Sequence, residues 1–202
     1  MIKQEWPNLA SMFFKQAGQL GEKPFLWAKR GGIYQSLSWK DSASRVTELA
    51  SGLLEHGITR GDRVVLVSEN RPAWLIADLS IMSIGAITVP AYTTNTPNDH
   101  LHILNDSGAR GAIVSNRKLA EKLIAAATQS KNLEFIISID PPDASQDLSF
   151  NFLHLDDVIE KGRHNKNNIT ETAALGALDD TACIIYTSGT GGQPKGVMLS
   201  HR

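Results

Sequence analysis

The sequence reads Tyr186-Thr187-Ser188-Gly189-Thr190-Gly191-Gly192-Gln193-Pro194-Lys195-Gly196-Val197 shortly before its last residue, Arg202. Glycine, serine and threonine dominate this stretch, and its one lysine directly follows a proline. Because glycine has no Cβ and tolerates positive φ, such a backbone can approach an anion closely. Hydroxyls and consecutive backbone N–H groups add donors, and the lysine adds a positive charge suited to phosphate. The stretch therefore predicts a phosphate-binding loop, which follows an apolar, strand-like run at 182–186.

Two familiar phosphate-loop patterns do not fit this stretch. The Walker A pattern requires a Gly-Lys pair five residues after Gly189, where this chain has Pro194-Lys195. The dinucleotide pattern G-x-G-x-x-G matches at Gly189 and Gly191 but again meets Pro194 at its last glycine. It also requires a following helix and an acidic residue. The alternative without a ligand is a flexible glycine-rich linker.

The loop does resemble the signature loop of the adenylate-forming, or acyl-activating, superfamily. The usual form of that loop reads Tyr/Phe-Thr-Ser-Gly-Thr-Thr-Gly-x-Pro-Lys-Gly-Val, and this chain departs from it only at Gly191, where threonine is usual. The change removes one hydroxyl and raises the entropy lost on ordering the loop. Other landmarks of the family are similar to residues 37–41, 57–64, 68–74, 85–92, 103–107 and 198–202. Of these, 85–92 and 103–107 favour the long-chain fatty acyl-CoA synthetase branch.

The resemblance implies a reaction in two halves. A carboxylate attacks the α-phosphate of ATP, which gives an acyl-adenylate and pyrophosphate, and a thiol, usually of coenzyme A, then displaces AMP. It implies the cofactors ATP, Mg²⁺ and coenzyme A, and a fatty acid as the substrate of the parent enzyme. The residues that would cradle the β- and γ-phosphates are Thr187, Ser188, Gly189, Thr190, Gly191, Gly192 and Lys195. Fixed donors there would stabilise the departing pyrophosphate without reorganising.

The resemblance assigns no catalytic residue and no metal ligand to this chain. The family's aromatic-Gly-x-Thr-Glu segment for adenine and magnesium, its acidic residue for the ribose, its hinge and its carboxyl-terminal lysine are not found in these 202 residues. The expectation is an N-terminal fragment, about the first third, of an ATP-dependent fatty acid–CoA ligase that is inactive alone. Two alternatives stay open: a non-catalytic module that binds nucleotide or a partner protein, and one half of a split ligase.

The fold class follows from a regular alternation of strands and helices. Short apolar runs at 64–67, 87–89, 111–114 and 135–139 begin about 24 residues apart, with helical segments at 72–84, 97–105 and 117–129 between them. This pattern predicts an α/β fold with a parallel sheet covered on both faces, here the incomplete βαβ layers of an adenylate-forming enzyme's N-terminal domain. A leucine-rich solenoid has a similar period, but its Leu-x-x-Leu-x-Leu pattern is absent.

The chain is expected to form one truncated AMP-binding domain with four parts. Residues 1–39 predict a helix at 7–20 and a hairpin turning at Gly31-Gly32, and 40–140 hold the βαβ layer. Ser38 with Asp41, and Thr96 with Asp99, are expected to cap helices. Residues 141–180 are expected to be loops, a short helix at 155–161 and an exposed linker at 163–172, and 181–202 hold the last strand and the phosphate loop.

Composition narrows the remaining possibilities. The 202 residues, 42% of them hydrophobic, suffice for one sizeable core, and a net charge of −1 does not suggest a nucleic-acid surface. The first residues lack the apolar core of a signal peptide, and no apolar run approaches the ~20 residues of a transmembrane span, so a cytoplasmic protein is expected.

Several single residues also have expected places. The histidines His100, His102 and His201 are expected at the surface, the first two on different faces of one helix. His201 follows the loop, so the alternative for it is an approach to the nucleotide. Arg71 and Glu69 are expected to shape a helix start. Tyr92, Trp74 and Cys183 are expected in the core. The strand at 182–186 is expected to leave an apolar edge unpaired, which would favour self-association.

Overall fold

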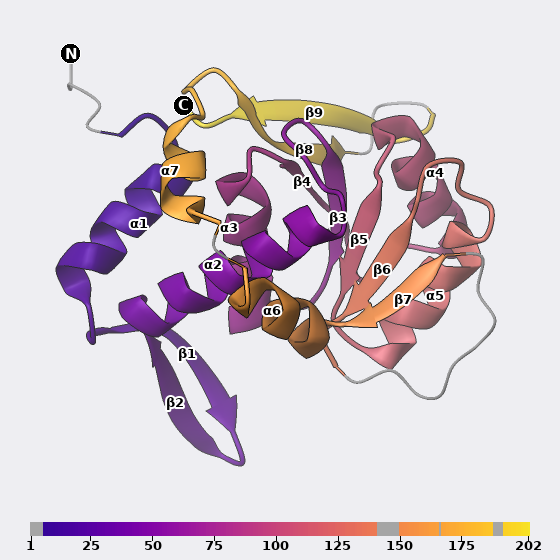
Figure 1. Cartoon of the computed structure of the whole chain (residues 1–202). Helices are drawn as coiled ribbons and strands as arrows, with labels where there is room; N and C mark the ends of the chain where they lie inside the picture. Colours follow the sequence, from indigo (N-terminus) through magenta and orange to yellow (C-terminus); the bar gives the residue numbers. More distant parts are fainter. Residues whose placement is uncertain (1–5, 141–149, 166, 188–191) are drawn as a thin grey trace.

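The structure is a computed structural model that describes residues 6–140, 150–165, 167–187 and 192–202. Its centre is a seven-stranded sheet of order β7-β6-β5-β3-β4-β8-β9 (Figure 1). The strands are β3 (Arg63–Val67), β4 (Ile87–Pro90), β5 (Gly111–Val114), β6 (Phe135–Ser138), β7 (Asn151–His154), β8 (Thr181–Thr187) and β9 (Lys195–Ser200). Every neighbouring pair is parallel except β8 and β9, which are antiparallel. The predicted α/β fold and the parallel layer within 40–140 are confirmed.

Helices cover both faces of the sheet. Those described are α1 (Leu9–Leu20), α2 (Trp39–Glu55), α3 (Pro72–Ser83), α4 (Pro97–Ser107), α5 (Arg117–Ala127), α6 (Leu155–Arg163) and α7 (Ile169–Ala174). One apolar cluster joins one sheet face to α1, α2, α3, α6 and α7, and a second joins the other face to α4 and α5. Figure 1 shows α4 and α5 on the opposite side of the sheet from α2 and α6.

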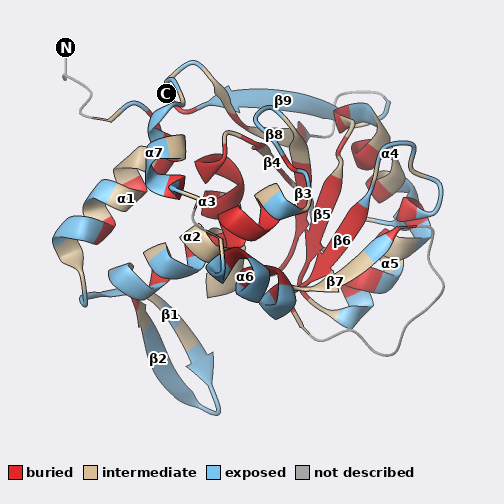
Figure 2. Cartoon of the chain, in the orientation of Figure 1, coloured by how far each residue is buried: buried red, intermediate tan, exposed pale blue. Residues whose placement is uncertain are grey.

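The alternation of side chains along β3 explains this two-sided core. Val64 and Leu66 point into the first cluster, whereas Val65 and Val67 point into the second. All four are fully buried, and Figure 2 shows the same burial across β5 and β6. A strand buried on both faces must be apolar throughout, which is why these runs lack a polar alternation.

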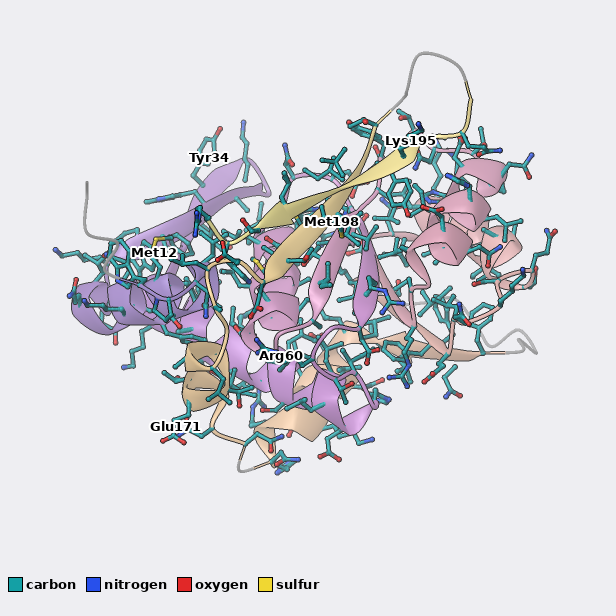
Figure 3. The ribbon with its side chains drawn as sticks, turned by 90° about the horizontal axis from the view of Figure 1, so that it is seen from above. Met12, Tyr34, Arg60, Glu171, Lys195 and Met198 are labelled. Atoms are coloured by element: carbon teal, nitrogen blue, oxygen red, sulfur yellow. The ribbon has the colours of Figure 1, made fainter. Side chains whose placement is uncertain are left out.

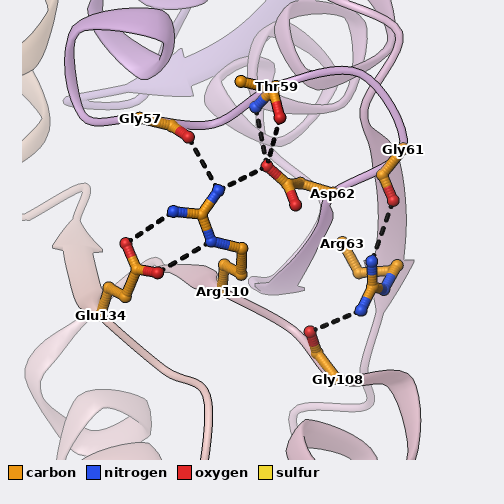
Figure 4. A network of polar contacts seen from close by, with 8 residues as sticks. All are labelled: Gly57, Thr59, Gly61, Asp62, Arg63, Gly108, Arg110 and Glu134. Atoms are coloured by element: carbon orange, nitrogen blue, oxygen red, sulfur yellow. Dashed lines mark hydrogen bonds and ion pairs between the residues drawn. The ribbon is translucent and has the colours of Figure 1, made fainter.

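The amino-terminal edge of the sheet is fastened by ion pairs (Figure 4). Arg110, just before β5, donates to the carboxylates of Asp62 at 2.7 Å and Glu134 at 2.8 Å, and to the Gly57 carbonyl at 2.8 Å. Burial raises the pKa of Asp62, but bonds from Thr59 and Arg110 outweigh it and lower that pKa below its usual value. These contacts connect the residues just before the amino-terminal ends of β3, β5 and β6.

Local signals in the sequence set the helix ends as expected. Ser38 caps α2 by accepting from the Asp41 N–H at 3.0 Å. Thr96 and Asp99 form a complete capping box at the start of α4. Gly57, at φ +82°, follows the end of α2, where a left-handed residue favours glycine.

The predicted amino-terminal hairpin is also present. Strands β1 (Pro24–Arg30) and β2 (Ile33–Ser38) pair antiparallel, and Figure 1 shows them projecting from the body. Gly31 and Gly32 turn the chain at φ +56° and +86°, as a two-residue loop with positive φ at both positions requires.

The prediction for 141–180 was incomplete. The linker expected at 163–172 instead contains the start of α7, where Asn168 accepts from the Glu171 N–H at 3.3 Å and Ile169 is buried. Ile169 and Ala173 lie four residues apart on one helix face, but the polar residues around them obscured that pattern. Strand β7 was missed because it has only four residues, at the edge of the sheet.

The expectation of an unpaired β8 was wrong. β8 pairs with β4 on one side and with β9 on the other, so the open edge belongs to β9. Cys183 on β8 is half-buried rather than buried. Tyr92 is 64% exposed and does not join the core, whereas Trp74 packs partly buried against it.

Candidate functional site

The predicted phosphate loop connects β8 to β9 at the carboxyl-terminal edge of the parallel strands. Ligands of open α/β sheets bind outside this edge. Ser188, Gly189, Thr190 and Gly191 lie outside the described residues. The described flanks place the two ends of the loop: Thr187 is the last residue of β8, and Lys195 is the first of β9.

The strand register brings two predicted phosphate ligands together. Thr187 and Lys195 are paired across the β8–β9 ladder. The residue that carries the hydroxyl and the residue that carries the ammonium therefore face each other where the loop leaves the two strands. Both residues are exposed, and Gly192 has φ +144°, a value that favours glycine. Figure 3 shows Lys195 at the α4 end of β9 and Met198 further along the strand.

Helix α4 contacts the chain on both sides of the loop. The Tyr186 hydroxyl donates to Asp106 Oδ2 at 2.6 Å, and His102 Nε2 lies 2.7 Å from the Pro194 carbonyl oxygen. The rings of His102 and Tyr186 meet edge to face with centroids 5.9 Å apart. Burial, and then Asp106, raise the pKa of the Tyr186 hydroxyl, which therefore stays protonated at neutral pH.

Sequence reasoning missed this role of α4. It placed His102 at the surface, whereas the structure has it half-buried against the loop. The signal that was available is the spacing of His102 and Asp106, four residues apart on a predicted helix, which puts both on one face.

The other two histidines are buried as well, against expectation. His100 is fully buried on the inner face of α4, and burial lowers its pKa to about 4. His201 is 7% exposed, and its Nδ1 lies 3.4 Å from the Leu9 backbone N. His201 follows the far end of β9, about 20 Å from Lys195 at the rise of an extended strand, so it does not approach the loop.

Glu69 and Arg71 stand just before α3, and Arg71 is its N-cap residue but makes no side-chain cap hydrogen bond. The Glu69 carboxylate accepts from the side chains of Ser115 and Asn116 beyond β5. The bond from Ser115 is the main reason that the pKa of Glu69 falls below its usual value. Arg71 pairs with Asp140 at 2.9 Å. These contacts are made between protein groups at the β3–β5 boundary.

The described donors fit a polyphosphate. Thr187 supplies a hydroxyl and Lys195 an ammonium, two kinds of donor that can bind phosphate oxygens, and Gly192 between them has positive φ. Among the described residues, no group of three or more His, Cys, Asp or Glu could hold a metal ion. No helix in the described ranges is long and apolar enough to cross a membrane.

The fold and this loop define a class of protein: the N-terminal domain of an adenylate-forming enzyme. The anthranilate CoA ligase AuaEII, solved with anthranoyl-AMP, superposes on 98% of this chain with a TM-score of 0.83 at 22% identity; the chain covers 36% of it. A benzoate CoA ligase from Burkholderia xenovorans matches 96% of the chain with a TM-score of 0.75 at 25% identity, and the chain covers 34% of it.

Sequence comparison identifies the family. The profile described as AMP-binding enzyme matches residues 13–202, so the chain belongs to that family. It is 30% identical over 200 residues to the long-chain-fatty-acid–CoA ligase FadD15 of Mycobacterium tuberculosis, covering 97% of this chain and 32% of that protein. It is 26% identical to the long-chain-fatty-acid–[acyl-carrier-protein] ligase AEE15 of Arabidopsis thaliana, covering 98% and 29%. The chain thus spans about a third of the length of these relatives.

Proposed function

We propose that this chain is the N-terminal, phosphate-binding portion of an ATP-dependent fatty acid–CoA ligase. In the first half-reaction a carboxylate oxygen bonds to the α-phosphorus of ATP, and the bond from that phosphorus to the bridging oxygen breaks, releasing pyrophosphate. In the second, the sulfur of coenzyme A bonds to the acyl carbon and AMP leaves. The observation that carries the proposal is the family match over 13–202, with the phosphate loop at the end of β8.

In this proposal the loop binds the β- and γ-phosphates. The residues concerned are Thr187, Ser188, Gly189, Thr190, Gly191, Gly192 and Lys195. Lys195 neutralises charge that grows on the leaving pyrophosphate, and the backbone N–H groups and hydroxyls donate to its oxygens. Mg²⁺ bound to ATP would offset part of the charge on these phosphates, and no residue of this chain is assigned to hold it. A fatty acid is favoured as substrate because ligases of long-chain fatty acids recur among the relatives.

We further propose that the 202 residues bind triphosphate weakly and do not adenylate an acid by themselves. The family segments for adenine, ribose and the adenylating lysine are not found in them, so the loop acts without the rest of the nucleotide site. The proposed intracellular place of this activity is the cytoplasm, where ATP and coenzyme A are available.

Calorimetry with Mg·ATP and a pyrophosphate-exchange assay with palmitate test both parts. Lys195→Ala should weaken binding by about tenfold to a hundredfold, since a charge-assisted contact contributes about 1.5–3 kcal/mol. Lys118→Ala on α5, an exposed lysine in a different part of the chain, should not change it. Exchange should be at background in all three proteins. Equal affinity of the wild type and Lys195→Ala would refute the loop assignment, and exchange above the Lys195→Ala background would refute inactivity.

A neighbouring reading frame that encodes the family's later motifs would instead favour a split ligase. ATP binding that Lys195→Ala leaves intact would favour a non-catalytic module that binds nucleotide elsewhere.

A further inference from the structure

The phosphate loop has its two ends fastened to one helix. Tyr186 stands directly before Thr187, and Pro194 stands directly before Lys195, so each α4 contact adjoins one of the predicted ligands. The hydrogen-bonded ladder between β8 and β9 ends at the pair Thr187 and Lys195, so it does not hold the loop residues beyond that pair. The α4 contacts therefore add a constraint where the ladder stops.

The contact between Tyr186 and Asp106 is a strong one. Tyr186 is 5% exposed, and its hydroxyl donates to a carboxyl oxygen of Asp106 across only 2.6 Å. Removing the carboxylate would leave a buried hydroxyl without this partner, which costs more than losing an exposed hydrogen bond.

The contact between His102 and Pro194 fixes the other side of the loop. Proline has no backbone N–H, so the Pro194 carbonyl is its one backbone hydrogen-bonding group. A carbonyl only accepts, so His102 Nε2 carries the proton and donates across 2.7 Å. The neutral ring protonated at Nε2 and the doubly protonated ring both make this bond.

Gly196 on β9 leaves room for the Tyr186 side chain in the position where it contacts Asp106. It pairs with Tyr186 across the ladder, and a Cβ at this position would lie 2.8 Å from Ile184 Cγ2 and 3.3 Å from the Tyr186 hydroxyl oxygen. A larger residue would therefore push the tyrosine away from Asp106. The glycine after the loop's lysine has a packing reason in this structure.

We propose that His102 and Asp106 are positioning residues for the phosphate loop, acting through Pro194 and Tyr186. They fix the loop's two ends before ATP arrives, so less conformational freedom is lost on binding. Neither residue touches the phosphates in this account. The inference rests on the proposed function only in that the anion bound by the loop is the triphosphate of ATP.

Hydrogen exchange of the 202-residue chain without any ligand tests the fastening directly. His102→Leu, which removes the donor, should speed exchange of the amides in 193–197 about fivefold to tenfold, as expected for one lost hydrogen bond. His102→Gln, which keeps an N–H donor, should restore most of the protection. The control variant Asn98→Ala, which changes a residue on the same helix and in the same surface groove, should show the exchange rates of the wild type. The amides of β3 and β5 should exchange at wild-type rates in every variant.

Affinity for inorganic tripolyphosphate tests the consequence. His102→Leu and Tyr186→Phe should each weaken it about fivefold to tenfold, with the affinity of His102→Gln close to the wild type and the melting temperatures of the two His102 variants nearly equal. A purely structural role would instead lower the melting temperature without this rescue. Unchanged exchange in His102→Leu and Tyr186→Phe would overturn the inference. If exchange changes as expected but Lys195→Ala binds tripolyphosphate as well as the wild type, the positioning stands and the proposed function fails.

Discussion

The inner strands β3, β5 and β6 and the hairpin β8–β9 belong to one sheet but differ in almost every physical respect. The inner strands are parallel, paired on both sides and buried on both faces. In the hairpin, β8 is the one strand that pairs with β9 among the described residues, and every residue of β9 is exposed, with Met198 at 71%. Figure 2 shows the contrast between the red centre and the pale β9. The inner strands contribute the buried core, and the proposed phosphate loop lies beside the more exposed hairpin.

The first prediction contrasts one side chain from each region. Ile113→Ala on β5 removes a fully buried side chain and should lower the free energy of unfolding by about 2–5 kcal/mol. Leu199→Ala on β9, 43% exposed, should cost about 1 kcal/mol or less. Urea denaturation of both variants measures the difference. Similar losses would mean that the hairpin carries as much of the core as the inner strands.

The second prediction concerns the helices that cover the inner strands. Gly162 on α6 faces α2 so closely that a Cβ would lie 1.9 Å from the Glu48 carbonyl oxygen. Gly162→Ala should therefore destabilise the fold by about 3 kcal/mol. Gly18→Ala on α1, where a Cβ would meet nothing within 4 Å, should stabilise it by roughly 0.5–1 kcal/mol. Equal melting temperatures of the two variants would contradict the close packing of α2 on α6.

The third prediction concerns the inner face of α4, behind the loop. Because burial lowers the pKa of His100 from 6.5 to about 4, the unfolded chain binds a proton between these pH values and the folded chain does not. Stability should fall by at most about 3 kcal/mol as the pH decreases through this range. Both ring nitrogens lack a hydrogen-bond partner among the described residues, so His100→Leu should remove that slope without a large loss at pH 7.

The control for this pH dependence is His164→Ala, which removes an exposed histidine on α6 that pairs with Glu160 at 3.0 Å. It should keep the slope of the wild type between pH 6.5 and 4. An unchanged slope in His100→Leu would show that other groups cause the pH dependence.

The fourth prediction concerns the open edge of β9. An unpaired edge with exposed Val197, Met198 and Leu199 is a template for pairing with another chain, so the 202 residues should self-associate as the concentration rises. Met198→Lys should reduce association with little change in stability, because a lysine on an edge strand disfavours such pairing. Light scattering after size exclusion measures both. A monodisperse wild type at high concentration would contradict this expectation.

Much of the fold could be predicted because the inner strands are set by local patterns. Each short apolar run defines a strand without reference to distant residues. In the same way, Pro97 and the capping residue Thr96 define the start of α4. The pairing of β9 with β8 could not be predicted in this way, because it depends on the return of the chain after the loop. Helix α7 was missed for a related reason: Ile169 is buried by a tertiary contact that its polar neighbours do not indicate.

The sequence predicts a chemistry for the candidate site but not the contacts that hold the ends of the loop. The residue types of the loop indicate a phosphate ligand whatever the fold around them. Asp106 contacts a residue 80 positions further along the chain, and His102 contacts one 92 positions further. No local sequence pattern predicts such contacts. Burial of His100 and His201 is likewise a tertiary property.

The most direct test of the account is a titration of the ¹⁵N-labelled 202-residue chain with Mg·ATP, followed residue by residue by NMR. The account predicts shifts concentrated at the amides of Thr187, Gly192 and Lys195 and their neighbours, a small shift at Tyr186, and none at β3, β5 or β6. In Lys195→Ala the same shifts should need about tenfold to a hundredfold more ATP. Shifts confined to another part of the chain, or shifts at the loop that Lys195→Ala leaves unchanged, would contradict it.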